Sequence, residues 1–219
     1  MPVSSNTSPL SARPRHHNTL VLCLAFISGF IVMAIELLGG RILAPYFGSS
    51  IYVWGSIITV FMLSLSLGYL AGGLLSLREP RLTLYGSFYI AAAVLLLPLV
   101  LSGNAIMEAL FLRIEDPRYG SLLVSMLLFF LPTAVMGMIA PYSVRLLVVE
   151  RERSGHIAGL LYFISTLGSA IGTLATSFYL VLWFEVNQIL LTMALALLLS
   201  GALAIVVGRK SNLALAVSS

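Results

Sequence analysis

Six long apolar segments constrain this chain more than any other feature of its sequence. Each is about twenty residues or longer, which is the length of a helix that crosses the hydrocarbon core of a bilayer. The segments are unbroken runs rather than the alternation of apolar and polar residues found in barrel strands. Because only helices and closed barrels satisfy their backbone groups in lipid, the pattern predicts six transmembrane helices. The predicted spans are approximately 19–38, 53–77, 82–101, 121–147, 157–182 and 188–207.

Composition leads to the same fold class, an all-α integral membrane protein built as a six-transmembrane-helix bundle. The chain is 59% hydrophobic and only 9% charged, whereas about a quarter of the residues of a soluble domain are charged. The lipid bilayer is therefore the expected partner of most side chains. The net charge of +4 comes without a dense basic run, so we expect no nucleic-acid partner.

The segments outside the spans are short. Residues 1–18 are rich in Ser, Pro, Arg and His, which predicts a disordered cytoplasmic tail. Residues 19–209 then form the transmembrane domain, and 210–219 form a short cytoplasmic tail. A cleaved signal peptide is the alternative for the N-terminus, but its apolar region would be about 7–15 residues, shorter than the first span.

Basic residues segregate between the two sets of loops. With the N-terminus inside, nine fall on the inner side and three on the outer side. This bias predicts a multi-pass protein of the cytoplasmic (inner) membrane with both termini in the cytoplasm. The nine are Arg13, Arg15, Arg78, Arg81, Arg145, Arg151, Arg153, Arg209 and Lys210, and the three are Arg41, Arg113 and Arg118. In the long outer loop, 104–114 has the helical spacing of a short interfacial helix.

Two sets of short motifs recur in the same order in both halves. Ala-Pro-Tyr occurs at 44–46 and at 140–142, and a Gly-x-x-x-Gly pair follows each triplet, at Gly68 and Gly72 and at Gly168 and Gly172. Three helices per half would make the second copy inverted, as in many transporters. Chance recurrence of common membrane residues is the alternative. The glycine faces predict close helix packing, and we expect the second and fifth spans to be neighbours.

Glu36 is the sharpest single feature, because a carboxylate within a transmembrane helix is costly. It predicts either a cation site or proton relay, or a structural ion pair with Arg41. Gly39-Gly40 is expected to break the helix there, which would let the chain fold back. Tyr46, Tyr52 and Trp54 follow; they are either part of a cavity beside Glu36 or an ordinary aromatic belt at the interface.

The chain lacks the sequence patterns of common catalytic centres. Its three histidines have no metal-ligand spacing with a carboxylate or thiol, and it has no nucleophile motif or phosphate-binding glycine loop. We therefore expect no metal, no cofactor and no catalytic residue.

The motifs together resemble the membrane domain of the spermidine synthase-like (fused major-facilitator/spermidine synthase) family. The resemblance lies in Glu36 with 41–45, in 47–55, 67–73, 131–137 and in 159–172. It implies a domain resembling half of a major-facilitator transporter. In that family a soluble aminopropyltransferase-like domain often follows, and the present sequence contains no segment onto which its catalytic residues map.

The expected function rests on this resemblance and on one acidic residue. We expect the membrane subunit of a spermidine synthase-like system, which transports or binds a small cationic or polar molecule such as a polyamine. Glu36, Arg41, Tyr46, Tyr52 and Trp54 are the expected substrate-binding residues, since cation–π contacts suit amines. The alternative is a membrane anchor for a soluble synthase-like enzyme at the cytoplasmic face. A homo-oligomer is compatible with either function.

Overall fold

A computed structural model describes residues 15–114, 116–148 and 154–217, and the side chains of 17–114, 116–148 and 154–211. Its helices in chain order are α1 (Arg15–Phe47), α2 (Ile51–Leu75), α3 (Leu82–Phe111), α4 (Pro117–Gly137), α5 (Ile139–Leu147), α6 (Ser154–Ala175), the π-helical turn η2 (Thr176–Leu180), α7 (Val181–Trp183) and α8 (Val186–Val217). Six stretches are long and apolar enough to cross a membrane, with α4 and α5 forming one and α6, η2 and α7 another. The predicted all-α six-helix class is confirmed for the described residues, which contain no strand.

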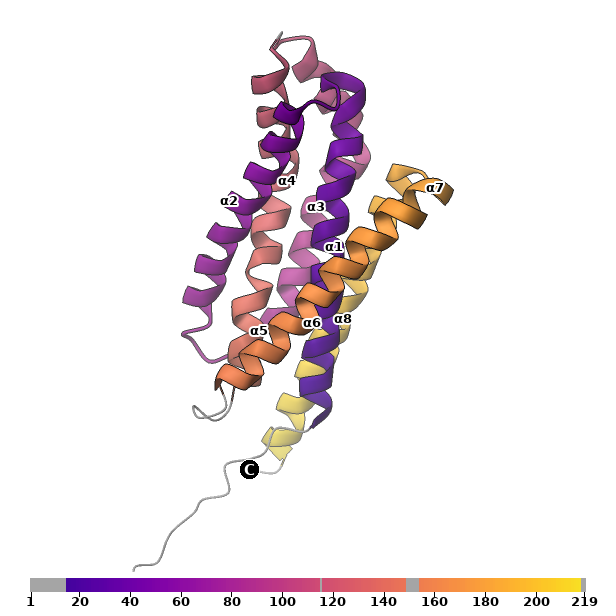
Figure 1. The fold of residues 1–219 in the computed structure, drawn as a ribbon. Coiled ribbons are helices and arrows are strands. Elements are labelled where there is room, and N and C mark those ends of the chain that lie inside the picture. Colours follow the sequence, from indigo (N-terminus) through magenta and orange to yellow (C-terminus); the bar gives the residue numbers. More distant parts are fainter. Residues whose placement is uncertain (1–14, 115, 149–153, 218–219) are drawn as a thin grey trace, which may run out of the picture.

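The six stretches alternate in direction, so the start of α1 and the end of α8 lie at the same end of the bundle (Figure 1). We call this the basic end, since the loop 76–81 and the residues Arg145, Arg209 and Lys210 lie there. The other, distal end holds the turns at 48–50 and 184–185 and the residues 112–114 and 116. Of the predicted tail 1–18, residues 15–18 form the start of α1, and the residues up to 14, like Arg151 and Arg153, lie outside the described residues.

Two predicted interruptions are wrong because the helices continue through them. α1 runs unbroken past Gly39 and Gly40. A methyl group on Gly40 would lie 2.6 Å from the Trp54 ring, so this glycine admits a neighbouring side chain rather than ending the helix. α1 ends instead at Gly48, whose φ of +77° is unfavourable for other residues. The predicted interfacial helix at 104–114 is mostly the last part of α3.

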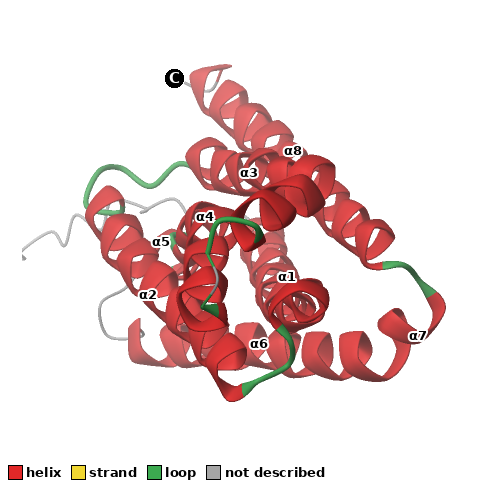
Figure 2. Cartoon of the chain, turned by 90° about the horizontal axis from the view of Figure 1, so that it is seen from above, coloured by secondary structure: helices red, strands yellow, loops and turns green. Residues whose placement is uncertain are grey.

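Three helix pairs make the most extensive contacts: α1 with α6, α2 with α4, and α3 with α8. Seen from above, α1 lies between α6 on one side and the α3–α8 pair on the other (Figure 2). Glycines allow the close approach in each pair. In the third, a methyl group on Gly86 would lie 2.6 Å from the Gly201 carbonyl oxygen, and one on Gly201 would meet the Gly86 carbonyl oxygen at the same distance. Small residues of this kind let backbones pack where lipid removes the hydrophobic drive.

The prediction that the second and fifth spans pack against each other is wrong. Gly68 and Gly72 of α2 face the backbone of α4 and Met138, whereas Gly168 and Gly172 of α6 face the backbone of α1. Each glycine face therefore has its own partner helix. The sequence pattern identified the small faces but held no information about which helix each would meet.

The two glycine contacts are nevertheless copies of one another. On the first partner helix the facing groups are Ala134, Gly137 and Met138; on the second they are Phe26, Gly29 and Phe30, with the same spacing. The first half consists of α1, α2 and α3, and the second half of α4–α5, α6–α7 and α8. In an inverted repeat α1 corresponds to α4, α2 to α6 and α3 to α8. The α2–α4 contact then corresponds to the α6–α1 contact, and the α3–α8 contact corresponds to itself. Together with the alternating helix directions, these contacts agree with an inverted repeat.

The Ala-Pro-Tyr triplets do not share this equivalence. Ala140 lies two residues after Met138, whereas Ala44 lies fourteen residues after Phe30. The tyrosines differ too, since Tyr142 is fully buried and Tyr46 is half-buried against Phe111. The triplets therefore recur without occupying matching positions, and the glycine spacing is the part of the predicted repeat that the contacts reproduce.

Candidate functional site

Two cavities open beside α1 between α2 and α6, and we call the space that holds them the crevice. Glu36 lies on α1 at a level between the two cavities, although it lines neither of them. Its side chain is half-buried. On the wheel of α1 it lies within about 40° of both Gly29, which faces Ser165 of α6, and Gly40, which faces Trp54 of α2. The helix therefore points the carboxylate toward the space that separates α2 from α6. In Figure 2, α6 lies below α1 and α2 lies to the left of it.

The carboxylate has no partner within the part of the chain that the structure describes. No hydrogen bond or ion pair of Glu36 is found there, and the one ion pair among these residues joins Arg81 to Glu79. The expected pair with Arg41 does not form. Since α1 continues through residue 40, five residues place Arg41 about 140° around the helix from Glu36. Arg41 is exposed near the distal end, on another face of α1.

A cavity of about 410 Å³ opens in the crevice one turn from Glu36, toward the distal end. We call it the Trp54 cavity. It lies between α1, the start of α2 and the π-helical turn, and its walls are largely apolar with hydroxyls from Ser49, Thr176 and Ser177. The lining residues are Leu37, Gly40, Arg41, Ala44, Ser49, Trp54, Thr176, Ser177 and Val181.

The Thr176 hydroxyl is buried and has no hydrogen-bond partner. A helical threonine in lipid usually donates to the carbonyl oxygen four residues earlier, as Thr173 does to Ser169 at 2.9 Å. Thr176 begins the π-helical turn, where the backbone is widened. Turns of this kind occur often at functional sites. Thr176 lines the Trp54 cavity, but its hydroxyl oxygen is enclosed by the protein.

A smaller cavity of about 180 Å³ lies on the other side of Glu36, toward the basic end. We call it the Tyr69 cavity. It is bounded by α1, α2, α6 and the α4–α5 junction, and Tyr69 and Tyr162 line it from α2 and α6. The Ser169 hydroxyl lies 3.2 Å from the Gly29 carbonyl oxygen and 3.1 Å from that of Ser165. The crevice thus offers aromatic faces and hydroxyls above and below a single carboxylate.

The five residues expected to bind substrate do not form one site. Arg41 and Trp54 line the Trp54 cavity, while Tyr46 lines a separate cavity beside α3 and α8. Tyr52 is engaged elsewhere: the Arg118 guanidinium carbon lies 4.4 Å from the centre of its ring, and an Arg118 Nη donates to its hydroxyl at 3.4 Å. Tyr52 therefore belongs to the distal surface.

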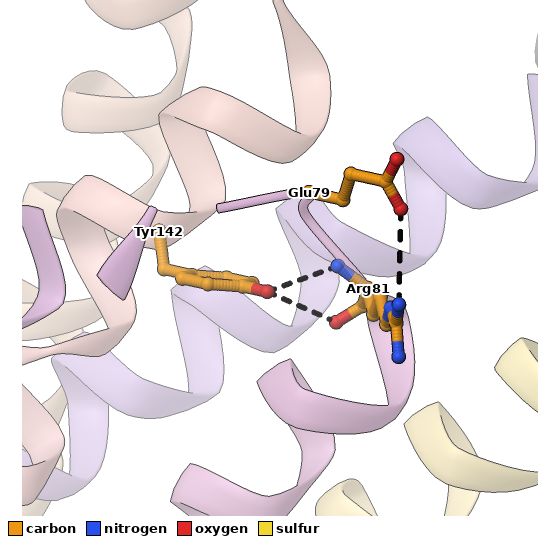
Figure 3. Close-up of polar contacts among 3 residues, drawn as sticks. All are labelled: Glu79, Arg81 and Tyr142. Atoms are coloured by element: carbon orange, nitrogen blue, oxygen red, sulfur yellow. Dashed lines mark hydrogen bonds and ion pairs between the residues drawn. The ribbon is translucent and has the colours of Figure 1, made fainter. Parts of the chain in front are cut away.

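A buried tyrosine cluster fixes the basic end. The Tyr142 hydroxyl accepts from the Arg81 backbone N–H at 2.9 Å and lies 3.4 Å from the Arg81 carbonyl oxygen (Figure 3). The exposed Arg81–Glu79 ion pair, at 3.7 Å, adds little stability. Behind Tyr142, the Tyr85 hydroxyl lies 3.1 Å from that of Tyr89 and 2.8 Å from that of Ser143. The loop 76–81 is therefore held on α5.

Sequence reasoning missed Thr176 and Tyr142 as functional or structural groups. Nothing in the local sequence marks the π-helical turn, and a tyrosine near a span end is common. Among the described residues no three His, Cys, Asp or Glu side chains gather closely enough to hold a metal ion. Comparison with protein-family models, with curated proteins and with solved structures gives no match to this chain.

Proposed function

We propose that this protein binds and transports a small amine-bearing molecule through the crevice between α1, α2 and α6. The observation on which the proposal rests is the position of Glu36, half-buried and unpaired between two cavities. A polyamine is the leading substrate class, because the carboxylate suits an ammonium group. The rings of Trp54, Tyr69 and Tyr162 suit cation–π contact.

Energetics favour a cationic ligand over an empty carboxylate. An acidic side chain at the centre of a membrane helix costs about 2.5–3.5 kcal/mol on insertion scales. A bound ammonium group would offset part of this cost, whereas a structural role would require a protein partner, and none lies among the described residues.

The repeated helix contacts also support transport. Inverted repeats of three helices let two halves exchange conformations around a site near their junction. The crevice lies at such a junction, since α1 and α2 come from the first half and α6 from the second. We further propose that both termini are cytoplasmic in an inner membrane, because the basic residues gather at the end where the described termini lie.

A second candidate function is a membrane anchor for a soluble synthase-like enzyme, within a spermidine synthase-like system. The observation that favours it is the loop 76–81, held to Tyr142 through the Arg81 backbone. Arg78, Arg81 and Arg145 are thereby presented on a fixed surface at the basic end, and a partner with an acidic face would fit there. An anchor of this kind has no need of the crevice, so the two functions are separable.

The test is uptake of radiolabelled putrescine or spermidine into proteoliposomes that contain the purified chain. Glu36→Gln keeps the size of the side chain and removes its charge, so we expect uptake to fall to background while the helix content and elution profile are unchanged. Glu108→Gln is the matched control, because Glu108 is exposed in the last turn of α3. Uptake that is equal in Glu36→Gln and the unaltered chain would rule out the carboxylate as the substrate site. In that event the anchor function would be preferred.

A further inference from the structure

A separate cavity of about 340 Å³ lies at the distal end, on the side of α1 that faces α3 and α8. Its floor is apolar and its rim is polar, with Asn104 and Asn187 on opposite sides. Arg41 reaches it from α1 and is shared with the Trp54 cavity. The lining residues are Arg41, Ile42, Pro45, Tyr46, Leu99, Asn104, Met107, Glu185, Val186, Asn187 and Leu190.

Two opposite charges border this cavity without neutralising each other. Arg41 and Glu185 are both exposed, and no ion pair joins them, since the described residues contain only the Arg81–Glu79 pair. Glu185 stands immediately before α8. Its backbone N–H is already satisfied, because it donates to the Gln188 Oε1 at 3.2 Å. The carboxylate itself is left for another partner.

From this arrangement we propose that the cavity binds a small zwitterion, with its acidic group at Arg41 and its ammonium group at Glu185. A simple anion would leave the charge of Glu185 without a partner, and a simple cation would leave the charge of Arg41 without one. A zwitterion satisfies both with charge-assisted hydrogen bonds. The apolar floor accepts the short carbon linker, and Asn104 and Asn187 can each donate and accept hydrogen bonds.

A ligand with one acidic group and one ammonium group could come either from solution or from the lipid at this level of the membrane. Phosphoethanolamine is a free zwitterion of suitable type, and the same group forms the head of phosphatidylethanolamine in the lipid leaflet. The cavity lies where the spans meet the distal turns, so both are within reach. The experiment therefore has one arm for each source.

In the first arm, the purified chain in detergent is titrated with phosphoethanolamine, ethanolamine or ethyl phosphate, and the affinity is measured by calorimetry. We expect phosphoethanolamine to bind at least about tenfold more tightly than ethanolamine, which has only the ammonium group, or ethyl phosphate, which has only the acidic group. Arg41→Gln and Glu185→Gln should each weaken it by about tenfold, and the exchange Arg41→Glu with Glu185→Arg should recover part of the loss. Arg113→Gln is the matched control, since it removes an exposed charge at the same end outside the cavity.

In the second arm, the chain is placed in nanodiscs of mixed phosphatidylethanolamine and phosphatidylglycerol, and retained lipid is measured by native mass spectrometry. Preferential retention of phosphatidylethanolamine that Arg41→Gln or Glu185→Gln abolishes supports the headgroup as the ligand. Binding in the first arm without such retention supports a free zwitterion. Equal binding of ethyl phosphate and phosphoethanolamine together with no lipid preference, or the same loss in Arg113→Gln, would overturn the proposal. Glu36→Gln should leave both arms unchanged, so this result is independent of the proposed transport site.

Discussion

Gly72→Ala provides the most direct test of how the helices pack. The added methyl group would lie 2.5 Å from the Met138 carbonyl oxygen and 2.6 Å from its Cα atom. Both atoms belong to backbone, so no rotamer change can make room. The α2 helix must move away from its partner by several tenths of an ångström, and overpacking of this kind costs about 1–3 kcal/mol.

The adjacent glycine supplies the control. A methyl group on Gly73 would meet nothing within 4 Å. Both substitutions replace a helical glycine by alanine in α2, which by itself favours the helix by about 1 kcal/mol. That gain cancels when the two variants are compared. The difference between Gly72→Ala and Gly73→Ala therefore isolates the helix contact, at about 1–3 kcal/mol.

The assay is thermal unfolding of the purified chain in detergent, followed by tryptophan fluorescence. For a chain of about this size, each kcal/mol shifts the midpoint by roughly 2–4 °C. Gly172→Ala should behave like Gly72→Ala, because its methyl group would lie 2.8 Å from the Phe30 Cα atom in the equivalent contact of the other half. Gly159→Ala, with open space around it, is its control. A Gly72→Ala midpoint at or above that of Gly73→Ala would refute the packing argument.

Three further results are expected. In a cysteine-free background, Arg78→Cys and Arg113→Cys should react with a membrane-impermeant maleimide from opposite sides of sealed vesicles, and reaction from one side would contradict the alternating topology. Tyr142→Phe removes the hydrogen bonds to the Arg81 backbone. It should cost about 1 kcal/mol and speed amide exchange in the loop 76–81, whereas unchanged exchange would show that the loop is held by other contacts. Thr176→Val should leave the unfolding midpoint unchanged or raised, because the buried hydroxyl that is lost has no partner; a lower midpoint would point to a structural role.

The number of membrane-spanning helices could be predicted from the sequence, whereas the residues at which the helices begin and end were predicted less well. The apolar runs set the spans because lipid demands internal backbone pairing over a fixed thickness. The prediction that α1 ends at Gly39 and Gly40 was wrong, because a glycine in a membrane helix can serve close packing rather than helix termination. Gly48, with its positive φ, was the true terminator.

The candidate site divides in the same way. Glu36 was identifiable from its cost in the membrane, because that cost depends only on residue type and depth. The residues around Glu36 could not be predicted from the sequence. The expected partner Arg41 lies on another face of α1, and Tyr52 contacts Arg118 instead. The two cavities on either side of the level of Glu36 are lined from α2 and from the α6–α7 stretch, which are distant from α1 in sequence.

The sequence by itself determined that the chain is a helical membrane protein, which faces of its helices are small, and that one carboxylate lies within a span. These properties depend on hydropathy and helical periodicity, which are local. Only the tertiary structure decided that α2 packs on α4 and α6 on α1, and that a crevice with two cavities opens beside Glu36. Between helices in lipid, contact is selected by the fit of backbone and side chains across pairs of helices. That fit is a property of both surfaces together, and neither segment contains it alone.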